Sequence, residues 1–113
     1  MCGIAGELRK DSVTPDRALL EEMGQTLAHR GPDDQGVLVN GSCGLAHRRL
    51  SIIDVSSGGH QPMQTPDGRY AIVFNGEIYN YRELAEQFLD AVTLQSQSDT
   101  EVLLHLLARQ GTA

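Results

Sequence analysis

The first few residues constrain the fold of this chain more than any other segment. Residues 2–8 form a short run with apolar side chains at alternate and adjacent positions, and this pattern predicts a buried β-strand. The strand begins almost at the chain terminus, which is an unusual place for a core element. Its first residue, Cys2, is also one of only two cysteines in the sequence.

The next forty residues predict a helix and a hairpin. Thr14-Pro15 has the pattern of an N-cap followed by proline at the first helical position, and the predicted helix runs to about His29. Its apolar face consists of Leu19, Leu20, Met23 and Leu27. Residues 37–39 and 43–46 flank Asn40-Gly41, which predicts a β-hairpin because Asn-Gly supplies the positive φ angles of a type I′ turn.

The second half continues this alternation. Residues 50–55 predict a strand or its end, residues 56–68 a loop, and residues 70–74 a strand that stops at Asn75-Gly76. Residues 77–79 are too short for a return strand, so this Asn-Gly pair predicts a strand-to-helix corner and not a second hairpin.

Two capping boxes then predict helices. Asn80 with Glu83 opens a helix that ends at Phe88, and Ser98 with Glu101 opens one that stops at Gly111, with a brief strand predicted at residues 92–94 between them. The apolar face of the last helix comprises Val102, Leu103, Leu106 and Leu107. The fold class is therefore α+β, and because the last helix ends only at the terminus, we expect the domain to continue beyond residue 113.

Composition narrows the class of partner. Hydrophobic residues make up 40% and charged residues 21% of the 113 residues, which is typical of one folded globular domain. The net charge of -6 disfavours nucleic acid and anionic membranes as partners. No apolar run approaches the ~18 residues that span a bilayer, and residues 1–10 lack the pattern of a secretory signal. We therefore expect a cytoplasmic protein.

Cys2 is the first candidate for chemistry. If Met1 is removed, the thiol of Cys2 lies beside a free α-amine with a reference pKa of ~7.7–8.0, and this amine can act as its base. The alternative is that Cys2 is a small buried hydrophobic residue.

Other residue types that such a reaction needs are also present. Asn75-Gly76 offers a side-chain amide next to an unobstructed backbone N–H, which is the pattern of an oxyanion hole. A substrate with both a carboxylate and an ammonium group needs Arg and Asp or Glu, and the spacing does not choose among the candidates Arg48, Arg49, Glu77 and Asp99.

A metal site and a reactive second cysteine are disfavoured. The four histidines are scattered over separate segments, and Cys43 with His47 and Cys2 does not have a recognised zinc-ligand spacing. Cys43 follows a hairpin turn between small residues, which favours a structural role. We further expect His29 and Arg30 to brace the site, and Asp33 or Asp54 to anchor loops by accepting backbone hydrogen bonds.

Six motifs in order along the chain resemble the glutaminase domain of the asparagine synthetase family, within the class II glutamine amidotransferases. They are Met1-Cys2-Gly3-Ile4-Ala5-Gly6, His29-Arg30-Gly31-Pro32-Asp33, Arg49-Leu50-Ser51-Ile52-Ile53-Asp54, His60-Gln61-Pro62, Asn75-Gly76-Glu77-Ile78-Tyr79-Asn80 and Ser98-Asp99-Thr100-Glu101. The resemblance implies an N-terminal-nucleophile (Ntn) hydrolase fold, an αββα sandwich, of which residues 1–113 are the N-terminal, incomplete part.

The resemblance also implies roles for individual residues. Cys2 is then the nucleophile and its α-amine the base, while Asn75 and Gly76 stabilise the oxyanion. Arg49 holds the glutamine carboxylate, and Asp99 with Glu77 holds the ammonium group. The remaining substrate contacts come from backbone groups in the segment Leu50, Ser51, Ile52 and Ile53.

The implied reaction converts glutamine to glutamate and ammonia, which a synthetase domain transfers to an ATP-activated carboxylate such as aspartate. Hydrolysis itself needs no cofactor or metal, whereas ATP and magnesium belong to the synthetase domain, which lies outside these residues. The resemblance also allows the full-length enzyme to be a homodimer. The alternative function is a noncatalytic relic or scaffold that keeps the glutaminase fold.

Overall fold

Three antiparallel strands form the larger sheet of the computed structural model, which describes residues 1–51, 56–89 and 94–111. They are β1 (Gly3–Leu8), β2 (Asp34–Asn40) and β3 (Cys43–Arg49), in the order β1-β3-β2. Gly3 pairs with Arg48 in this register, so the start of β1 lies beside the end of β3. This pairing places Cys2 next to Arg49 and Leu50.

The hairpin between β2 and β3 is confirmed, but its turn type differs from the prediction. Asn40 pairs with Cys43, so the loop contains only Gly41 and Ser42. Gly41 has a φ of 58°, whereas neither Asn40 nor Ser42 has a positive φ. A type I′ turn requires positive φ at both central residues, so the type I′ prediction is wrong. The shift of the loop by one residue makes Asn40 the last residue of the strand.

The predicted strand at the N-terminus is also confirmed, whereas its predicted burial holds for one face only. A Cβ atom on Gly3 would lie 2.8 Å from Cβ of Leu27, so this face is covered by the end of the first helix. Ile4 and Leu8 point to the other face and are 47% and 74% exposed. Among the described residues β1 pairs with β3 alone, and this edge position leaves both side chains uncovered.

Helix α1 (Arg17–Thr26) packs across all three strands. Its N-cap is Asp16, whose carboxylate accepts from the Ala18 N–H at 2.9 Å, and not Thr14 as predicted. Pro15 is buried against Gly44 of β3, which keeps it outside the helix. The helix ends three residues before His29, and Leu19 is 46% exposed while Leu20 is fully buried, so the predicted apolar face is only partly correct.

The predicted loop after residue 56 contains two short elements, the 3₁₀ helix η1 (Ser57–Gly59) and strand β4 (Met63–Gln64). Strand β4 pairs with β5 (Ala71–Ile72) in a second, two-stranded antiparallel sheet. Strand β5 is shorter than the five residues predicted at 70–74, because the Phe74 N–H donates to the side chain of Gln61 and not to a neighbouring strand.

Helix α2 (Tyr81–Phe88) has the predicted bounds without the predicted capping box. Asn80 makes no side-chain capping hydrogen bond, because its backbone (φ -96°, ψ 26°) is not in the extended conformation that an N-cap adopts. Of the other predicted strands, residues 52–55 and 92–93 lie outside the described residues, while Leu50, Ser51 and Leu94 are in no regular element.

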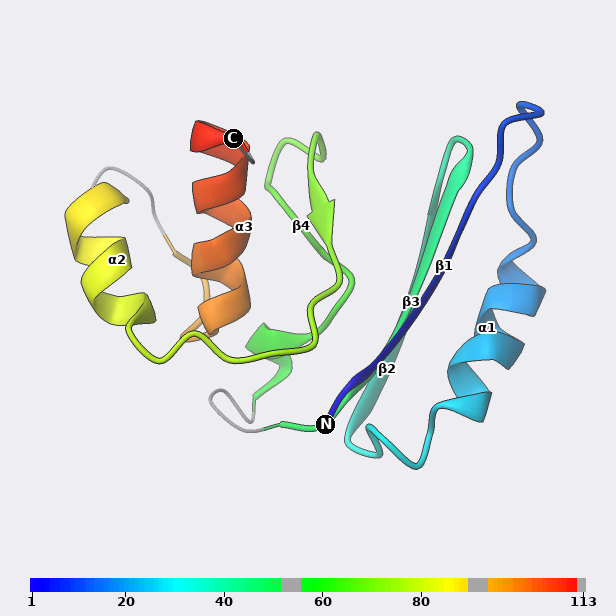
Figure 1. Cartoon of the computed structure of the whole chain (residues 1–113), viewed down its shortest axis with the longest axis horizontal. Coiled ribbons are helices and arrows are strands. Elements are labelled where there is room, and N and C mark those ends of the chain that lie inside the picture. Colours follow the sequence, from blue (N-terminus) through cyan, green and yellow to red (C-terminus); the bar gives the residue numbers. More distant parts are fainter. Residues whose placement is uncertain (52–55, 90–93, 112–113) are drawn as a thin grey trace.

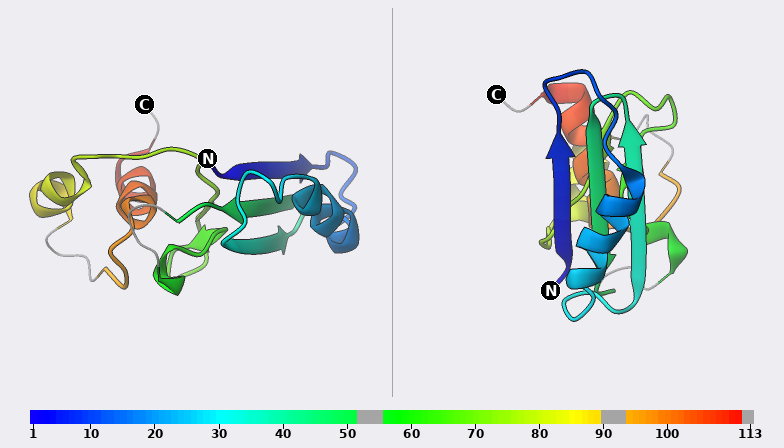
Figure 2. Two further views of the ribbon diagram at one scale, coloured as in Figure 1. Left: turned by 90° about the horizontal axis from the view of Figure 1, so that it is seen from below. Right: turned by 90° about the vertical axis from the view of Figure 1, so that its right-hand side faces the viewer.

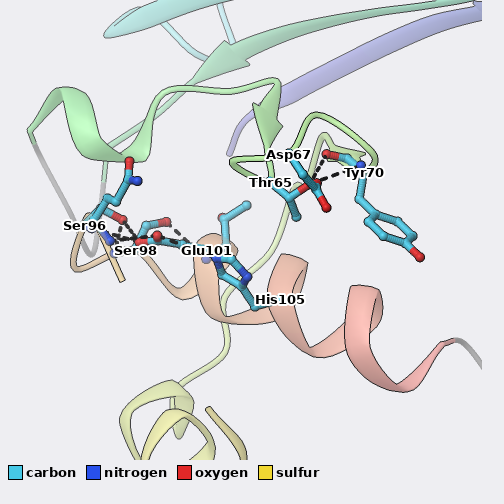
Figure 3. A network of polar contacts seen from close by, with 9 residues as sticks. Thr65, Asp67, Tyr70, Ser96, Ser98, Glu101 and His105 are labelled. Atoms are coloured by element: carbon cyan, nitrogen blue, oxygen red, sulfur yellow. Dashed lines mark hydrogen bonds and ion pairs between the residues drawn. The ribbon is translucent and has the colours of Figure 1, made fainter. Parts of the chain in front are cut away.

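Helix α3 (Asp99–Gln110) begins at the predicted Ser98 cap and ends at Gly111, whose φ is 74°. The Ser98 side chain accepts from the Thr100 N–H, but Glu101 does not complete a capping box. Its carboxylate instead accepts from the backbone N–H groups of Gln95 and Ser96, both at 2.8 Å, and from the Ser96 hydroxyl (Figure 3). Glu101 therefore anchors the loop that precedes the helix.

The buried face of α3 also differs from the prediction. Val102 and Leu104 are buried, whereas Leu103 and Leu106 are half-buried and Leu107 is 36% exposed. The helix packs against α2 and against the β4–β5 sheet, so it needs apolar residues on more than one side.

Successive layers make up the molecule. From right to left, Figure 1 shows α1, the three-stranded sheet, the β4 region and then α3 and α2, and Figure 2 shows α1 lying across one face of the sheet. The structure thus confirms a mixed domain of helices and antiparallel sheets. The assignment to an Ntn-hydrolase sandwich stays a prediction.

Candidate functional site

A cavity of about 320 Å³ lies where the start of β1, the end of β3, η1, the segment after β5 and the start of α3 meet. It is lined by Met1, Cys2, Arg49, Leu50, Gly59, Gln61, Phe74, Asn75, Gly76, Glu77, Tyr79, Ser98, Asp99 and Thr100. The structure thus brings together seven of the predicted site residues, namely Cys2, Arg49, Leu50, Asn75, Gly76, Glu77 and Asp99. Ser51 is not in the lining, and Ile52 and Ile53 lie outside the described residues.

The thiol of Cys2 faces the backbone of Leu50. Its Sγ atom accepts from the Leu50 N–H at 3.3 Å and lies 3.7 Å from the Leu50 carbonyl oxygen. The side chain is half-buried and free of any disulfide. While Met1 is attached, the nitrogen of Cys2 is a peptide nitrogen with no basic lone pair, so the predicted base exists only after Met1 is removed.

The segment between α1 and β2 braces Cys2 and the end of β3. Arg30 Nε donates to the Cys2 carbonyl at 3.2 Å. The Asp33 N–H donates to the Arg49 carbonyl at 2.9 Å, and its carboxylate accepts from the Ser51 N–H at 2.8 Å. The predicted bracing role of Arg30 is confirmed, and so is the predicted anchoring of a backbone N–H by Asp33. The bracing role of His29 stays a prediction, and Asp54 lies outside the described residues.

Arg49 is a buried cation on the cavity wall, and the residue is 7% exposed. One guanidinium nitrogen, Nη1, donates to the Ser56 carbonyl. The guanidinium also lies against Gly59, where a Cβ atom would be 2.1 Å from Nη2. A guanidinium has five N–H donors, so a group held in this way can still bind a carboxylate through two of them.

Asp99 supplies a buried anion across the cavity. Its Oδ2 atom accepts from the Ile78 N–H at 2.8 Å, which ties α3 to the segment after Asn75-Gly76. Asp99 is also the first residue of α3, where the helix dipole favours a negative charge. The cavity therefore carries a positive group and a negative group on different elements.

Asn75 is half-buried and Gly76 is exposed on the segment after β5. A Cβ atom on Gly76 would lie 2.8 Å from Cζ of Phe74, so the Phe74 ring packs against the backbone of Gly76. Nearby, interaction with the Glu77 carboxylate raises the pKa of Tyr79 above its ordinary value.

Gln61, Gly59, Phe74, Ser98 and Thr100 were not predicted as site residues. Gln61, Ser98 and Thr100 belong to two of the quoted motifs, His60-Gln61-Pro62 and Ser98-Asp99-Thr100-Glu101, but neither motif indicates what these side chains contact. Gly59 carries no signal in the sequence, because its role is to leave space for Arg49.

His47 connects the larger sheet to this site. Its side chain is buried on β3, and Nε2 lies 3.3 Å from the Phe74 carbonyl oxygen. A carbonyl only accepts, so Nε2 carries the hydrogen, and Nδ1 is a buried acceptor without a partner among the described residues. Burial lowers the pKa of His47 below 6.5, Arg49 and His60 lower it further, and the Phe74 carbonyl and Asp34 oppose the shift.

This lowered pKa predicts a specific loss of stability in acid. Well above pH 6.5 His47 is neutral in both the folded and the unfolded state, so it adds no pH dependence there. As the pH falls below 6.5, the unfolded chain binds a proton that the folded protein excludes, and the free energy of unfolding decreases.

A His47→Gln variant keeps a donor for Phe74 but cannot titrate. We expect the stability of the parent protein relative to this variant, measured by denaturant unfolding, to decrease steadily from pH 7 to pH 5. A difference that stays constant over this range would contradict the assignment of a neutral buried His47.

Neither a membrane-spanning helix nor a metal-ligand cluster occurs in the described ranges. No helix there is long and apolar enough to cross a bilayer. Within residues 1–51, 56–89 and 94–111, no three His, Cys, Asp or Glu side chains gather as a metal ion requires. Cys43 is free and half-buried.

A family model described as a glutamine amidotransferase domain matches residues 1–113, the whole chain. The chain belongs to the glutamine amidotransferase domain family. The predicted resemblance to the glutaminase domain of asparagine synthetases is confirmed by its relatives.

Three of these relatives come from two bacteria and an archaeon. Over 92% of its length, this amidotransferase domain is 47% identical to asparagine synthetase [glutamine-hydrolyzing] 1 of Bacillus subtilis, covering 17% of that protein. It is 38% identical to a putative asparagine synthetase 2 of Methanocaldococcus jannaschii and 37% identical to asparagine synthetase B of Escherichia coli, each over 98% of the chain, covering 24% and 20% of these proteins. The domain therefore spans about a fifth of the length of these relatives.

Proposed function

We propose that this domain hydrolyses the side-chain amide of glutamine, with Cys2 as the nucleophile once Met1 has been removed. The observation that carries the proposal is the convergence of Cys2, Asn75-Gly76, Arg49 and Asp99 on one cavity. These groups correspond to a nucleophile, an oxyanion hole, a carboxylate ligand and an ammonium ligand. Membership of the glutamine amidotransferase family supports the same chemistry.

In the first step the free α-amine of Cys2 takes the thiol proton, and the thiolate sulfur attacks the amide carbon of glutamine. The C=O electrons move to oxygen, giving a tetrahedral intermediate. The Asn75 side-chain amide and the Gly76 N–H stabilise this oxyanion. When the intermediate collapses, the C–N bond breaks, the α-ammonium gives its proton to the leaving nitrogen, and ammonia is released.

The second step regenerates the enzyme. A γ-glutamyl thioester on Sγ remains after the ammonia has left. Water gives a proton to the α-amine and attacks the thioester carbon, and the C–S bond then breaks. The thiolate recovers its proton and glutamate leaves. The same amine thus serves as base in both halves of the reaction.

The substrate is held at both ends of its amino-acid backbone. Arg49 pairs with the carboxylate, and Asp99 with Glu77 binds the ammonium group. Asp99 keeps its hydrogen bond to the Ile78 N–H, which fixes the carboxylate orientation. Backbone groups of Leu50, Ser51, Ile52 and Ile53 are part of the proposed substrate contacts, although Ile52 and Ile53 lie outside the described residues.

The released ammonia is passed to a synthetase domain, as the names of the relatives imply. That domain uses ATP and magnesium to activate a carboxylate such as that of aspartate, and neither enters the hydrolysis. A noncatalytic relic is not favoured, because Cys2, Asn75, Gly76, Arg49 and Asp99 are all present and all line the cavity.

The test is an assay of the full-length protein that contains this domain. We expect glutamine to be converted to glutamate and ammonia in equal amounts, and glutamine and free ammonia each to support amide synthesis when ATP and the acceptor are present. Amide synthesis from ammonia without any release of glutamate from glutamine would contradict the proposal.

Substitutions at the two charged ends are expected to weaken glutamine binding. Arg49→Lys loses the planar group that lies against Gly59, and Asp99→Asn loses the charge but keeps an acceptor for the Ile78 N–H. Each should raise KM for glutamine by about 10- to 100-fold with a smaller change in kcat. Ammonia-dependent synthesis should survive both changes.

Arg17→Lys is the matched control, because Arg17 is an exposed arginine on α1 that pairs with Glu21 at 3.3 Å. It should leave KM unchanged. Equal losses of kcat and of ammonia-dependent synthesis in Arg49→Lys and Asp99→Asn would assign these residues to folding or domain coupling instead.

A further inference from the structure

One buried amide connects two walls of the cavity. Gln61 is 5% exposed, and its Oε1 atom accepts from the Phe74 N–H at 2.6 Å. Its Nε2 atom donates to the Thr100 hydroxyl at 3.2 Å. A backbone N–H can only donate, so the Phe74 contact fixes which end of the amide is oxygen. Both polar ends of the Gln61 side chain are therefore engaged by protein groups.

The two partners of Gln61 adjoin the proposed catalytic and binding residues. Phe74 directly precedes Asn75-Gly76, and Thr100 directly follows Asp99. Within the part of the chain that the structure describes, no strand pairs with the proposed oxyanion segment at Phe74, so the Gln61 oxygen takes the place of a neighbouring strand. His47 holds the carbonyl of the same residue from β3. Phe74 is thus held through both of its backbone polar groups.

Gln61 is itself held by the larger sheet. Its carbonyl oxygen lies so close to β2 that a Cβ atom on Gly36 would be 2.1 Å away. The neighbouring His60 Nδ1 lies 2.6 Å from the Asp34 carboxylate. Thr100 is buried, and its N–H donates to the Ser98 hydroxyl at 3.1 Å. We call the link from Phe74 through the Gln61 side chain to Thr100 the Gln61 bridge. Gln61 and Thr100 are thus both held by further contacts with the protein.

We propose that Gln61 is a positioning residue that sets the distance between the Asn75-Gly76 oxyanion segment and Asp99. The inference rests on the proposed function. Through Phe74, Gln61 places the oxyanion donors against the amide of the substrate, and through Thr100 it places Asp99 against the ammonium group. One side chain thus aligns the reacting end and the binding end of glutamine.

The contact of Gln61 with Phe74 and its contact with Thr100 should have different effects on kcat and KM. Gln61→Met has a similar shape but bonds neither partner, so it should lower kcat by ~10- to 100-fold, as expected for a small displacement of catalytic groups, and also raise KM. Gln61→Glu keeps an acceptor for Phe74 and should recover much of kcat. Thr100→Val removes only the hydrogen bond between Gln61 and the residue that follows Asp99, so it should mainly raise KM. Thr100→Ser keeps the hydroxyl and should have a KM close to that of the parent protein.

Thr65→Val is the matched control for Thr100→Val. Thr65 is also a buried threonine, and its hydroxyl bonds to Asp67 and Tyr70 on the β4–β5 turn (Figure 3). Thr65 is not among the residues that line the cavity. It should lower the melting temperature without changing KM or kcat. Because Thr100→Val alters a single hydroxyl, it tests the bridge even where Gln61→Met does not fold.

The experiment measures kcat and KM for glutamine, the rate of ammonia-dependent synthesis and the melting temperature for each full-length variant, with Cys2→Ala in parallel. The expected result is impaired glutamine use with intact ammonia-dependent synthesis. If Cys2→Ala is inactive while Gln61→Met or Thr100→Val loses thermal stability and keeps parental kcat and KM, Gln61 is only structural and the inference is overturned. Hydrolysis that persists in Cys2→Ala would overturn the proposed function, and the inference with it.

Discussion

Replacing Cys2 by alanine is expected to reduce glutamine hydrolysis by ~10⁴-fold or more, to the background of the assay. Loss of the nucleophile costs about 10⁶ in kcat in a well-studied hydrolase, because no other group can form the acyl intermediate. The thiol lies on the cavity with Asn75, Gly76, Arg49 and Asp99. Among the described residues that line this cavity, Cys2 is the only cysteine, so no second thiol there can replace it. Glutamine binding and ammonia-dependent synthesis should both remain.

Two further variants test whether the loss of activity is due to the thiol of Cys2. Cys2→Ser should hydrolyse glutamine far more slowly than the parent, since a hydroxyl is a poorer nucleophile than a thiol near neutral pH. Cys43→Ala is the matched control, because Cys43 lies at the start of β3 and is not in the cavity lining. If Cys2→Ala keeps the parental rate, or if Cys43→Ala loses it with the fold intact, the assignment of the nucleophile is wrong.

Replacing Asn75 by alanine should lower kcat by ~10²–10³-fold with a smaller effect on KM. The Asn75 amide is proposed to donate to an oxyanion that exists only in the transition state and the intermediate, so its loss acts mainly on kcat. Asn75→Asp should be no better, because a carboxylate repels the oxyanion. Steady-state kinetics of glutamate release measure both constants.

Asn80→Ala is the control for this change. Asn80 is an exposed asparagine in the same loop region, and it makes no side-chain capping bond at α2. It should have parental kinetics. A normal kcat with a raised KM in Asn75→Ala would show that Asn75 binds the substrate and does not stabilise the oxyanion.

Sequence patterns predicted the elements that depend on neighbouring residues. The N-terminal strand, the β2–β3 hairpin and the ends of α3 follow from alternation, a Gly-containing turn and a serine cap, which are all local signals. The predictions were wrong where a contact with a residue distant in the sequence decides where a helix or strand begins or ends. Pro15 packs on Gly44 and leaves the N-cap of α1 to Asp16, and Gln61 takes the Phe74 N–H that a longer β5 would use.

Predicting the site required the resemblance as well as the residues. Spacing alone did not choose between Arg48 and Arg49, but successive residues of a strand point to opposite faces. Arg48 therefore bonds to Gly31 and Gln35, whereas Arg49 reaches the cavity. Gln61 was not predicted, because its role depends on the separation of two segments that meet only in the folded chain.

The role of Cys2 can be tested by identifying the atom that reacts with a glutamine analogue bearing a chloromethyl ketone in place of the amide. A thiolate displaces the chloride and forms a stable thioether, so peptide mass spectrometry locates it. We expect one adduct per active site, on a chain that begins at Cys2 without Met1, formed at the rate at which glutaminase activity is lost. Adduct formation at Cys43, or full glutaminase activity in a protein that retains Met1, would contradict the assignment of Cys2 as an N-terminal nucleophile.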